Sequence, residues 1–570
     1  MTLESRLDQW SRGWRGPLLA AVVALVAGLP GLFAVPPLDR DESRFAQATA
    51  QMLESGDFVS INYQDQPRDK KPVGIHWLQA ASVAVLSDAA DRDIWPYRVP
   101  SLLGAMLAAA ACAWGAAAFF GPRAGLLAGA MLGASFLLST EAFIAKTDAV
   151  LAGATTLALA ALGRIYLSAN GGPAVGWRTR LLFWLGVAGA MLVKGPVGPL
   201  VALMAGLALW AWDRKAPWAR SLGWGWGLLL VLVVVGPWAW AITVATDGAF
   251  WGAAIGGDLA PKLAGGHERH GGLPGYHLFL SPMLTFPSSL LLPAGLALGW
   301  KARAEPGVRF ALCWLVPTWL MFELLPTKLA HYSLPALGGL FWLMAAALRE
   351  PLGRISRIAG AALLGFSSLV FTAVCVAGLA EYGDDADLTW GAITIGLFLA
   401  TALAGGVLIF SRAAGAALVT AGAIGVLAHA AFFGQLVPRL EPLWLSQRIS
   451  LAMARTELAP REGVAPGPVE VAGYAEPSLV FALGTDTGLG GGADAARAIA
   501  EGRPAVVEAH ERPAFLAALR AAGLTPRPAG TVAGLDYSNG DEMRLTLYRG
   551  EPQKAPPATE PGAEEKEARP

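Results

Sequence analysis

The chain has 570 residues, of which 54% are hydrophobic and 15% are charged, and its mean hydropathy is +0.47. Because soluble globular proteins carry about 25% charged residues, this composition indicates a polytopic membrane protein. The formal net charge is zero, which excludes the basic field that recruits nucleic acid. Cys112, Cys313 and Cys375 each lie in an apolar run, so we interpret them as packing residues rather than as a disulfide or a metal site.

The first element is an apolar run from Gly16 to Pro36, preceded by Arg6, Arg12 and Arg15. A secretory signal peptide has the same order of basic and apolar residues. This run is longer than the apolar core of a signal peptide, and a membrane-spanning helix needs about 20 apolar residues. We therefore interpret it as an uncleaved first span.

Directly after this run the chain reads PLDRDESRFAQATAQMLESGDF, which packs Asp39, Arg40, Asp41, Glu42 and Arg44 together. From Asp41 onward, apolar residues recur at helical spacing, which predicts an amphipathic helix on the outer surface of the membrane. Acidic residues at its start complement the positive end of the helix dipole. The cluster is either a helix cap with a solvated interface or part of a polar site, and these two readings stay open.

A second surface segment, DQPRDKKPVGIHWLQ, groups Arg68, Lys70 and Lys71. These cations suit an anionic headgroup, or they reflect the general attraction of basic residues to a lipid surface, worth about 1 kcal/mol for each residue. The apolar stretch 76–86 that follows is short for a span. We expect it to lie at the membrane surface, so that residues of about 38–97 form juxtamembrane helices on the outer face.

Apolar segments of spanning length recur along the rest of the chain, and with the first run they predict about 13 transmembrane helices. Lys and Arg gather in cytoplasmic loops of membrane proteins. If the N-terminus is inside and 76–86 does not span, the basic loops fall on the inner side and the acidic stretch EYGDDADL falls outside. The same pattern predicts an external C-terminus. The further expected spans are 99–120, 124–140, 149–167, 181–193, 196–212, 222–246, 278–300, 308–325, 333–348, 358–380, 389–410 and 415–437.

Several ionisable residues then reach this outer face at the ends of different spans. The segment EAFIAKTDAVL contains Asp148, and MLVKGPVGPL sets Lys194 beside a Gly-Pro break. Such a break is tolerated at membrane depth where a cavity satisfies the freed backbone groups. The segment LLPTKLAHYSLPAL adds Lys328, His331 and Tyr332. Ionisable residues at span ends are costly and are usually functional or snorkel toward the interface. Because several such sites gather on one side, we expect a polar cavity open to the outside.

A Gly-rich loop, GGHERHGGLPGYHLFLSP, adds His267, Glu268, Arg269 and His270 on the same side. Histidine and carboxylate side chains could bind a divalent metal there, with His267 and His270 as the candidate ligands, although the pattern is a loose one. No cofactor other than such a metal ion is expected.

Carboxylates and several cations, without a nucleophilic Cys or Ser motif, suit glycosyl transfer. A carboxylate can activate an acceptor hydroxyl while cations hold the leaving phosphate. The outer side of a membrane lacks nucleotide sugars as a rule, so a lipid-phosphate sugar is the natural donor.

The composition changes after about Pro438, where strand-like and helix-like segments alternate. VEVAGYA, PAVVEAH and EMRLTLYRG read as strands, and ADAARAIAEG and PAFLAALRAAG read as helices. This alternation predicts a small α/β domain over 439–550, after a transmembrane domain of 1–438. The Pro- and charge-rich tail, 551–570, has a composition typical of disorder.

The motifs together resemble a known family. An acidic DE-x-R-F-A helix start, a KP-x-G-x-H-W-L block, a TD at the outer end of a span, a KGP break and a K-L-x-x-Y-x-L-P segment occur in one order between about Leu38 and Pro335. This order resembles the bacterial aminoarabinose transferases of lipid A and, more broadly, the polyprenyl-phosphate-sugar glycosyltransferases related to protein O-mannosyltransferases. The resemblance implies a GT-C fold, an all-α polytopic membrane protein with a C-terminal periplasmic α/β domain.

The resemblance also implies roles for individual residues. Asp41 would be the base or acceptor-orienting carboxylate, and Asp148 would support the sugar or acceptor site. The implied reaction moves a sugar, with inversion, from undecaprenyl phosphate to lipid A, a polysaccharide or another acceptor on the periplasmic face of the inner membrane. The residues implied to bind the donor phosphate or line the same cavity are Lys71, Arg44, Lys194, Arg269, Lys328 and Tyr332.

The sequence departs from the family at Lys70, where aminoarabinose transferases have a glutamate. This change puts a metal site in doubt, and it indicates a more cationic pocket that selects a different sugar or acceptor. Two alternatives remain: a protein O-mannosyltransferase-like enzyme, with a Ser or Thr hydroxyl as acceptor, and a lipid or sugar transporter. Transporters tend to carry polar residues near the bilayer midplane, often with internal repeats, whereas here these residues stand at the outer ends of spans.

Overall fold

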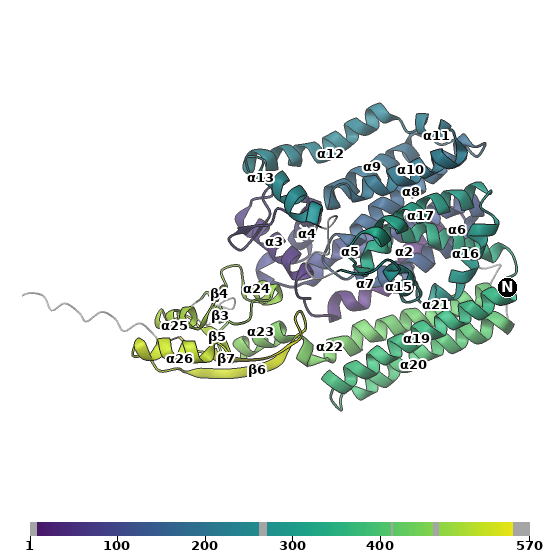
Figure 1. The fold of residues 1–570 in the computed structure, drawn as a ribbon. Coiled ribbons are helices and arrows are strands. Elements are labelled where there is room, and N and C mark those ends of the chain that lie inside the picture. Colours follow the sequence, from purple (N-terminus) through teal and green to yellow (C-terminus); the bar gives the residue numbers. More distant parts are fainter. Residues whose placement is uncertain (1–7, 262–270, 412–413, 460–466, 551–570) are drawn as a thin grey trace, which may run out of the picture. The chain divides into compact units, whose positions relative to one another are not determined.

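The computed structural model describes residues 8–261, 271–411, 414–459 and 467–550. The chain divides into a helical unit that ends at Glu441 and a second unit that begins at Pro442 (Figure 1). This boundary lies close to the one expected near Pro438. The tail 551–570, which we predicted to be disordered, lies outside the described residues.

Long apolar helices dominate the first unit. Nine segments in the described part of the chain are long and apolar enough to cross a membrane, and a bent helix pair raises the number to 10. This is a multi-pass membrane protein. The segments are α2 (Arg15–Ala34), α5 (Trp95–Phe120), α8 (Asp148–Ala169), α12 (Trp224–Ala245), α17 (Pro306–Leu324), Ala330–Arg349 around α18 (Leu334–Ala346), α19 (Arg354–Tyr382), α20 (Leu388–Ser411) and Ala414–Arg439, which contains α21 (Ala414–Ala431) and α22 (Val437–Arg439).

The other expected spans coincide with shorter, broken or more charged helices. The expected span 124–140 is interrupted at Ser135, whose hydroxyl accepts a hydrogen bond from the Leu138 N–H and so starts a new helix. The expected span 278–300 bends by 115° between its two halves. The helices concerned are α6 (Pro122–Ala134), α7 (Phe136–Glu141), α9 (Trp177–Lys194), α10 (Val197–Asp213), α15 (Tyr276–Leu284) and α16 (Leu292–Lys301).

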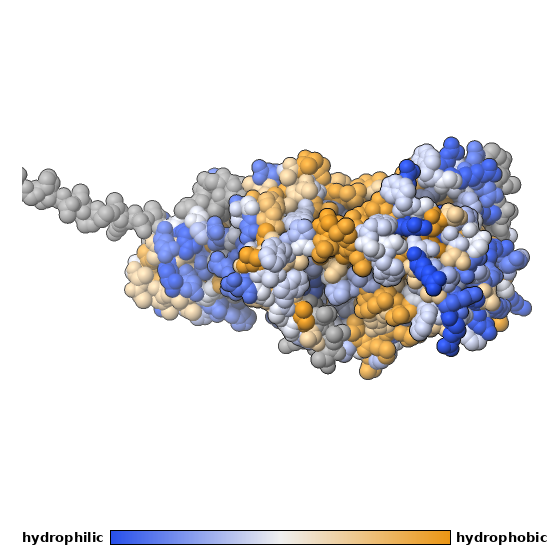
Figure 2. Space-filling view, turned by 90° about the horizontal axis from the view of Figure 1, so that it is seen from above, coloured by the Kyte–Doolittle hydropathy of each residue, from blue (hydrophilic) through white to orange (hydrophobic). Residues whose placement is uncertain are grey.

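The surface of this unit is typical of a protein in lipid. In the apolar stretch of α12, only 11% of the residues are buried inside the protein. The corresponding fraction is 28% for α19 and for α20. Figure 2 shows apolar side chains gathered on the flank of the helices and hydrophilic ones at the end near the N-terminus. Because lipid is as apolar as these side chains, the exposed leucines and valines of α12 need no protein partner.

Close helix packing sets the position of α8. A Cβ on Gly104 of α5 would lie 2.6 Å from the Cα of Val150, and one on Gly153 of α8 would lie 2.5 Å from the carbonyl oxygen of Gly104. The two backbones therefore approach as closely as small residues permit. This contact places Asp148, the first residue of α8, at the end of the unit that carries α3 and α4.

At that end, short elements connect the first two spans. The predicted amphipathic helix is α3 (Asp41–Ser55), which buries Phe45, Ala48 and Met52. A two-stranded hairpin follows, and the expected surface helix over 76–86 is α4, 13 residues long. The short elements of this unit include β1 (Asn62–Tyr63), β2 (Gln66–Pro67), α4 (Gly74–Leu86), α11 (Pro217–Arg220) and α13 (Ala249–Trp251).

The second unit is a five-stranded sheet with strand order β4-β3-β5-β7-β6. Strand β3 pairs in parallel with β4 and β5, whereas β7 pairs antiparallel with β5 and β6. The predicted strands and helices are present, and the sequence analysis missed α23, α24, β4 and β6, the last two being rich in Gly. The elements are α23 (Leu445–Arg455), β3 (Glu470–Ala472), α24 (Pro477–Leu483), β4 (Gly488–Gly490), α25 (Gly492–Ala500), β5 (Ala505–Glu508), α26 (Arg512–Ala521), β6 (Pro528–Asp536) and β7 (Asp541–Tyr548).

Candidate active site

A pocket of about 800 Å³ opens at the end of the helical unit that carries α3 and α4. Its walls come from segments far apart in the chain: the start of α3, the loop before α4, the starts of α8 and α10, α13 and the segment before α18. Among the expected site residues, the structure brings six together around this pocket, namely Asp41, Arg44, Lys71, Asp148, Lys194 and Tyr332. The polar cavity expected from the sequence is therefore present.

A buried ion pair holds the start of α3 in place. Arg98 of α5 donates from Nε to Oε1 of Glu42 and from Nη2 to Oε2, both at 2.8 Å, and neither side chain is exposed. Glu42 also accepts from the N–H groups of Leu38 and Ala145. The remaining guanidinium hydrogens bond carbonyls at the end of α2, including that of Val35 at 2.6 Å. A fully bonded bidentate pair of this kind fixes geometry, and here it fixes the position of Asp41.

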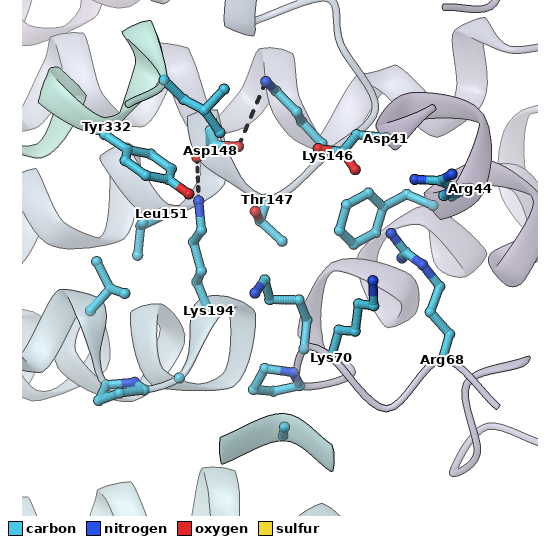
Figure 3. Close-up of a pocket in the computed structure, with 18 of the residues that line it drawn as sticks. Asp41, Arg44, Arg68, Lys70, Lys146, Thr147, Asp148, Leu151, Lys194 and Tyr332 are labelled. Carbon is cyan, nitrogen blue, oxygen red and sulfur yellow. Dashed lines mark hydrogen bonds and ion pairs between the residues drawn. The ribbon is translucent and has the colours of Figure 1, made fainter. Parts of the chain in front are cut away.

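Asp41 lines the pocket beside several cations (Figure 3). Burial alone would raise the pKa of this carboxyl, but the positive charges of Lys146 and Arg68, in that order, lower it below its usual value, with smaller contributions from His331 and Arg44. Asp41 is therefore ionised at neutral pH and able to accept a proton.

On the opposite wall, Lys194 and Asp148 form a close pair. The Lys194 Nζ lies 2.5 Å from Asp148 Oδ1, and it stands 5.6 Å from the centre of the Tyr332 ring (Figure 3). Lys194 ends α9, and Gly195 follows with φ of 62°, a conformation that favours glycine. The Gly-Pro break noted in the sequence therefore turns the chain into α10 and leaves the Lys194 side chain at the pocket.

Basic side chains from the segment before α4 form the outer edge of the pocket. Arg68, Lys70 and Lys71 all line it, and the Arg68 guanidinium lies 4.3 Å from the centre of the Phe45 ring. This edge therefore offers several donors to an anionic group. Lys70, the position at which the sequence analysis expected a departure from the family, belongs to the same edge.

The structure adds residues that the sequence analysis did not select. Lys146 lines the pocket, with its Nζ 3.8 Å from Asp148 Oδ2 and 3.3 Å from His331 Nδ1. Glu141, behind this wall, lies 3.1 Å from the same ammonium. The sequence could have indicated both residues, because Glu141 and Lys146 stand in the same EAFIAKTDAVL segment as Asp148.

Lys328 is placed differently from our expectation. Its ammonium donates to the carbonyls of Phe322, Glu323 and Leu325, at 3.2, 2.5 and 2.5 Å, and it is absent from the residues that line the pocket. The unpaired carbonyls at the end of α17 attract a cation. Lys328 caps this helix, so we withdraw its assignment to the phosphate site.

The expected metal ligands and one expected cation lie outside the described residues. These are His267, His270 and Arg269, within the segment 262–270. Among the residues that the structure describes, no cluster of His, Cys, Asp and Glu is arranged to hold a metal ion.

Comparison with known proteins finds similar sequences. Residues 70–240 match the family model described as dolichyl-phosphate-mannose-protein mannosyltransferase. The chain is 29% identical over 361 residues to the undecaprenyl phosphate-alpha-4-amino-4-deoxy-L-arabinose arabinosyl transferase of Pseudomonas paraeruginosa, and 27% identical over 342 residues to that of Yersinia pestis. These matches cover 60% and 59% of this chain, and 64% and 59% of the relatives, so less than two thirds of each relative is spanned.

The solved structures decide the fold. ArnT from Cupriavidus metallidurans in the apo state superposes with a TM-score of 0.73 at 19% identity, over 94% of this chain and 98% of that one. The form of that protein bound to undecaprenyl phosphate has a TM-score of 0.71 and covers 93% and 97%. The chain has the same fold as ArnT. The expected fold class, a helical polytopic membrane protein with a small C-terminal α/β unit, is confirmed.

Proposed function

We propose that this aminoarabinose-transferase-like chain is an integral-membrane glycosyltransferase that moves a sugar from a polyprenyl phosphate, such as undecaprenyl phosphate, to an acceptor. The single observation that supports it most is the pocket itself. An ionised carboxylate, Asp41, faces a wall of cations at the membrane-surface end of a fold shared with ArnT bound to undecaprenyl phosphate. A base and a phosphate clamp are the groups that this reaction needs.

The proposed reaction is a single displacement. Asp41 accepts the proton of an acceptor hydroxyl, whose oxygen forms a bond to the anomeric carbon of the sugar. The bond between that carbon and the donor phosphate oxygen breaks, and the lipid phosphate leaves with the electron pair. Arg44 and Lys71 stabilise its negative charge, and the resemblance predicts inversion at the anomeric carbon.

The pair Asp148–Lys194 is proposed to shape the sugar and phosphate site. Lys194 is held by Asp148 and faces the Tyr332 ring, so its ammonium is oriented before a ligand arrives. Preorganised charges of this kind cost no rearrangement when the phosphate leaves. Tyr332 contributes its hydroxyl to the same phosphate group in this proposal, and Arg269 belongs to the site only by the resemblance.

The pocket is proposed to face the periplasm of the bacterial inner membrane, with the C-terminal unit on that side. Support comes from the charge of the sequence. With the N-terminus inside, most basic connections between spans fall on the cytoplasmic side, and the acidic stretch EYGDDADL falls on the other side. The acceptor is lipid A, a polysaccharide or another surface molecule. The described edge of the pocket, with Arg68, Lys70 and Lys71, favours an acceptor or sugar without a positive charge.

A second candidate is protein O-mannosyl transfer, since residues 70–240 match a family described by that activity. The donor chemistry is the same, and only the acceptor, a Ser or Thr hydroxyl, differs. The test that separates the two is mass spectrometry of lipid A, surface glycan and periplasmic proteins from cells with the chain, without it, and with Asp41→Asn.

Loss of one sugar mass from a single acceptor, in both the deletion and the Asp41→Asn cells, would establish the transfer and name its product. If all three cell types carried the same glycans and no undecaprenyl-phosphate sugar accumulated, the proposed function would be refuted. A transporter would then be the next candidate, since it would change the amount of a lipid without changing any linkage.

A further inference from the structure

Glu141 is a buried acid behind the pocket that the reaction described above does not use. It ends α7, outside the candidate membrane spans, and only 4% of its surface is exposed. One carboxylate oxygen, Oε1, lies 3.1 Å from Lys146 Nζ and 3.8 Å from His331 Nδ1. The other, Oε2, is buried and accepts no hydrogen bond from any residue that the structure describes.

Such an arrangement destabilises the folded protein. A buried acceptor without a partner costs about 1–3 kcal/mol, and more for a charged group. Burial is also the main reason that the pKa of Glu141 is raised to about 7, while the charge of Lys146 acts against this rise. Buried acids with perturbed pKa values and a specific charged partner occur preferentially at functional sites.

The partner of Glu141 is a residue of the pocket wall. Lys146 is 8% exposed, and burial would lower its pKa, but Glu141 and Asp148 reverse this and raise it. Its ammonium therefore stays charged. Lys146 is also the cation that does most to lower the pKa of Asp41, and Figure 3 shows its side chain running between Asp148 and Asp41.

We propose that Glu141 is a positioning residue for the site: it holds the Lys146 ammonium at the pocket wall, where that ammonium meets the donor phosphate and keeps Asp41 ionised. This inference rests on the proposed function, because it assumes that a lipid phosphate enters the pocket. Glu141 itself touches neither the ligand nor the reacting atoms, and it acts through Lys146.

The groups that face Glu141 come from several elements. Lys146 approaches from the loop before α8, Asp148 from α8, Lys194 from α9 and His331 from the segment before α18. The Glu141 carboxyl changes its charge near neutral pH. Its attraction for the Lys146 ammonium is therefore strongest above about pH 7, where the carboxyl is ionised. Below that pH the neutral acid still accepts a hydrogen bond, as a glutamine would.

The test measures the affinity of the purified full chain for sugar-free undecaprenyl phosphate, at about pH 6 and about pH 8. Glu141→Gln keeps the shape and the hydrogen bond but removes the charge. We expect its dissociation constant to exceed that of the wild type about tenfold at the higher pH, in line with a charged hydrogen bond, and to match it at the lower pH. Glu141→Asp should restore part of the loss at the higher pH.

A double variant separates positioning from folding. Lys146→Met should weaken binding at both pH values, and adding Glu141→Leu to it should cause no further loss, because Glu141 acts only through that ammonium. Glu54→Gln is the matched control: the Glu54 carboxylate also pairs with a cation, the guanidinium of Arg92, but it lies outside the pocket. It should bind like the wild type.

Equal affinities of Glu141→Gln and wild type at the higher pH would refute the inference, as would tighter binding by Glu141→Gln. It would also be refuted if adding Glu141→Leu to Lys146→Met weakened the binding of undecaprenyl phosphate further. Each of these outcomes leaves the proposed function intact, because the wild type still binds the lipid phosphate. If the wild type failed to bind undecaprenyl phosphate, the proposed function itself would fail, and the role of Glu141 with it.

Discussion

Glu42 and Arg98 form a bidentate ion pair with no exposed surface, and they join the start of α3 to α5 across 56 positions of sequence. Asp41, the adjacent residue, points into the pocket instead. Two neighbouring acids of one short motif therefore have different tasks: one fixes the helix start, and the other faces the candidate reaction.

The first prediction concerns that ion pair. Glu42→Gln leaves a buried guanidinium without its counter-charge, which costs about 3–5 kcal/mol of folding free energy. We expect a lower unfolding temperature in detergent, followed by loss of activity. The control is Glu305→Gln, because Glu305 pairs with Arg349 at the surface and exposed pairs contribute about 0–1 kcal/mol. Equal unfolding temperatures of the two variants would contradict the structural role of Glu42.

The second prediction concerns Asp41. Asp41→Asn keeps the size of the side chain but cannot accept a proton, so transfer should fall by about 10²–10⁴-fold, the usual contribution of a general base. Expression, membrane insertion and binding of undecaprenyl phosphate should be retained. Asp65→Asn, on the exposed β1–β2 hairpin, is the matched control and should transfer normally. Normal transfer by the Asp41→Asn variant would remove Asp41 from the mechanism.

The pH dependence of transfer follows from the lowered pKa of Asp41. A carboxyl whose pKa is lowered in the folded protein stays ionised above its ordinary value of 3.8 and is protonated only as the pH falls further. We therefore expect no loss of activity from Asp41 protonation at mildly acidic pH. Lys146→Met removes the main cation that lowers this pKa, and the acid limb of its pH–rate profile should move to higher pH. An acid limb unchanged by that substitution would contradict the coupling.

The pair Asp148–Lys194 allows a double-mutant cycle. Asp148→Asn and Lys194→Met should each weaken donor binding, and the single losses should add to more than the loss of the double variant. Buried, hydrogen-bonded pairs show interaction energies of about 0.5–3 kcal/mol in such cycles. Losses that simply add would mean that the two side chains act independently, despite the 2.5 Å contact between them.

The last prediction concerns the basic edge of the pocket. Lys71→Ala should raise the KM for the lipid-phosphate donor about tenfold, in line with the loss of one charged contact, with a smaller effect on kcat. It should also reduce the salt dependence of donor binding, because salt screens exposed charges. Lys301→Ala, an exposed lysine at the end of α16 outside the pocket, is the control. An unchanged donor KM in Lys71→Ala would count against its phosphate role.

Part of the site could be predicted from sequence because only 15% of the residues are charged, so that each charge next to an apolar run is easily identified. Asp41, Lys71, Asp148 and Lys194 stand at the ends of apolar runs, and positive loop charge assigns these ends to one side. The structure brings all four to the same pocket. Lys328 shows the limit of this reasoning, because it also stands at a span end but donates to the carbonyls at the end of the preceding helix, α17.

The sequence by itself determined the membrane class, the order of the helices and the end at which the ionisable residues gather, because hydropathy and charge are properties of short stretches of chain. Only the tertiary structure decided which acid faces the pocket and which one is locked to Arg98, and that Glu141 meets Lys146 behind the wall. A side chain's partner depends on contacts between helices that are distant in sequence. No local pattern contains that information.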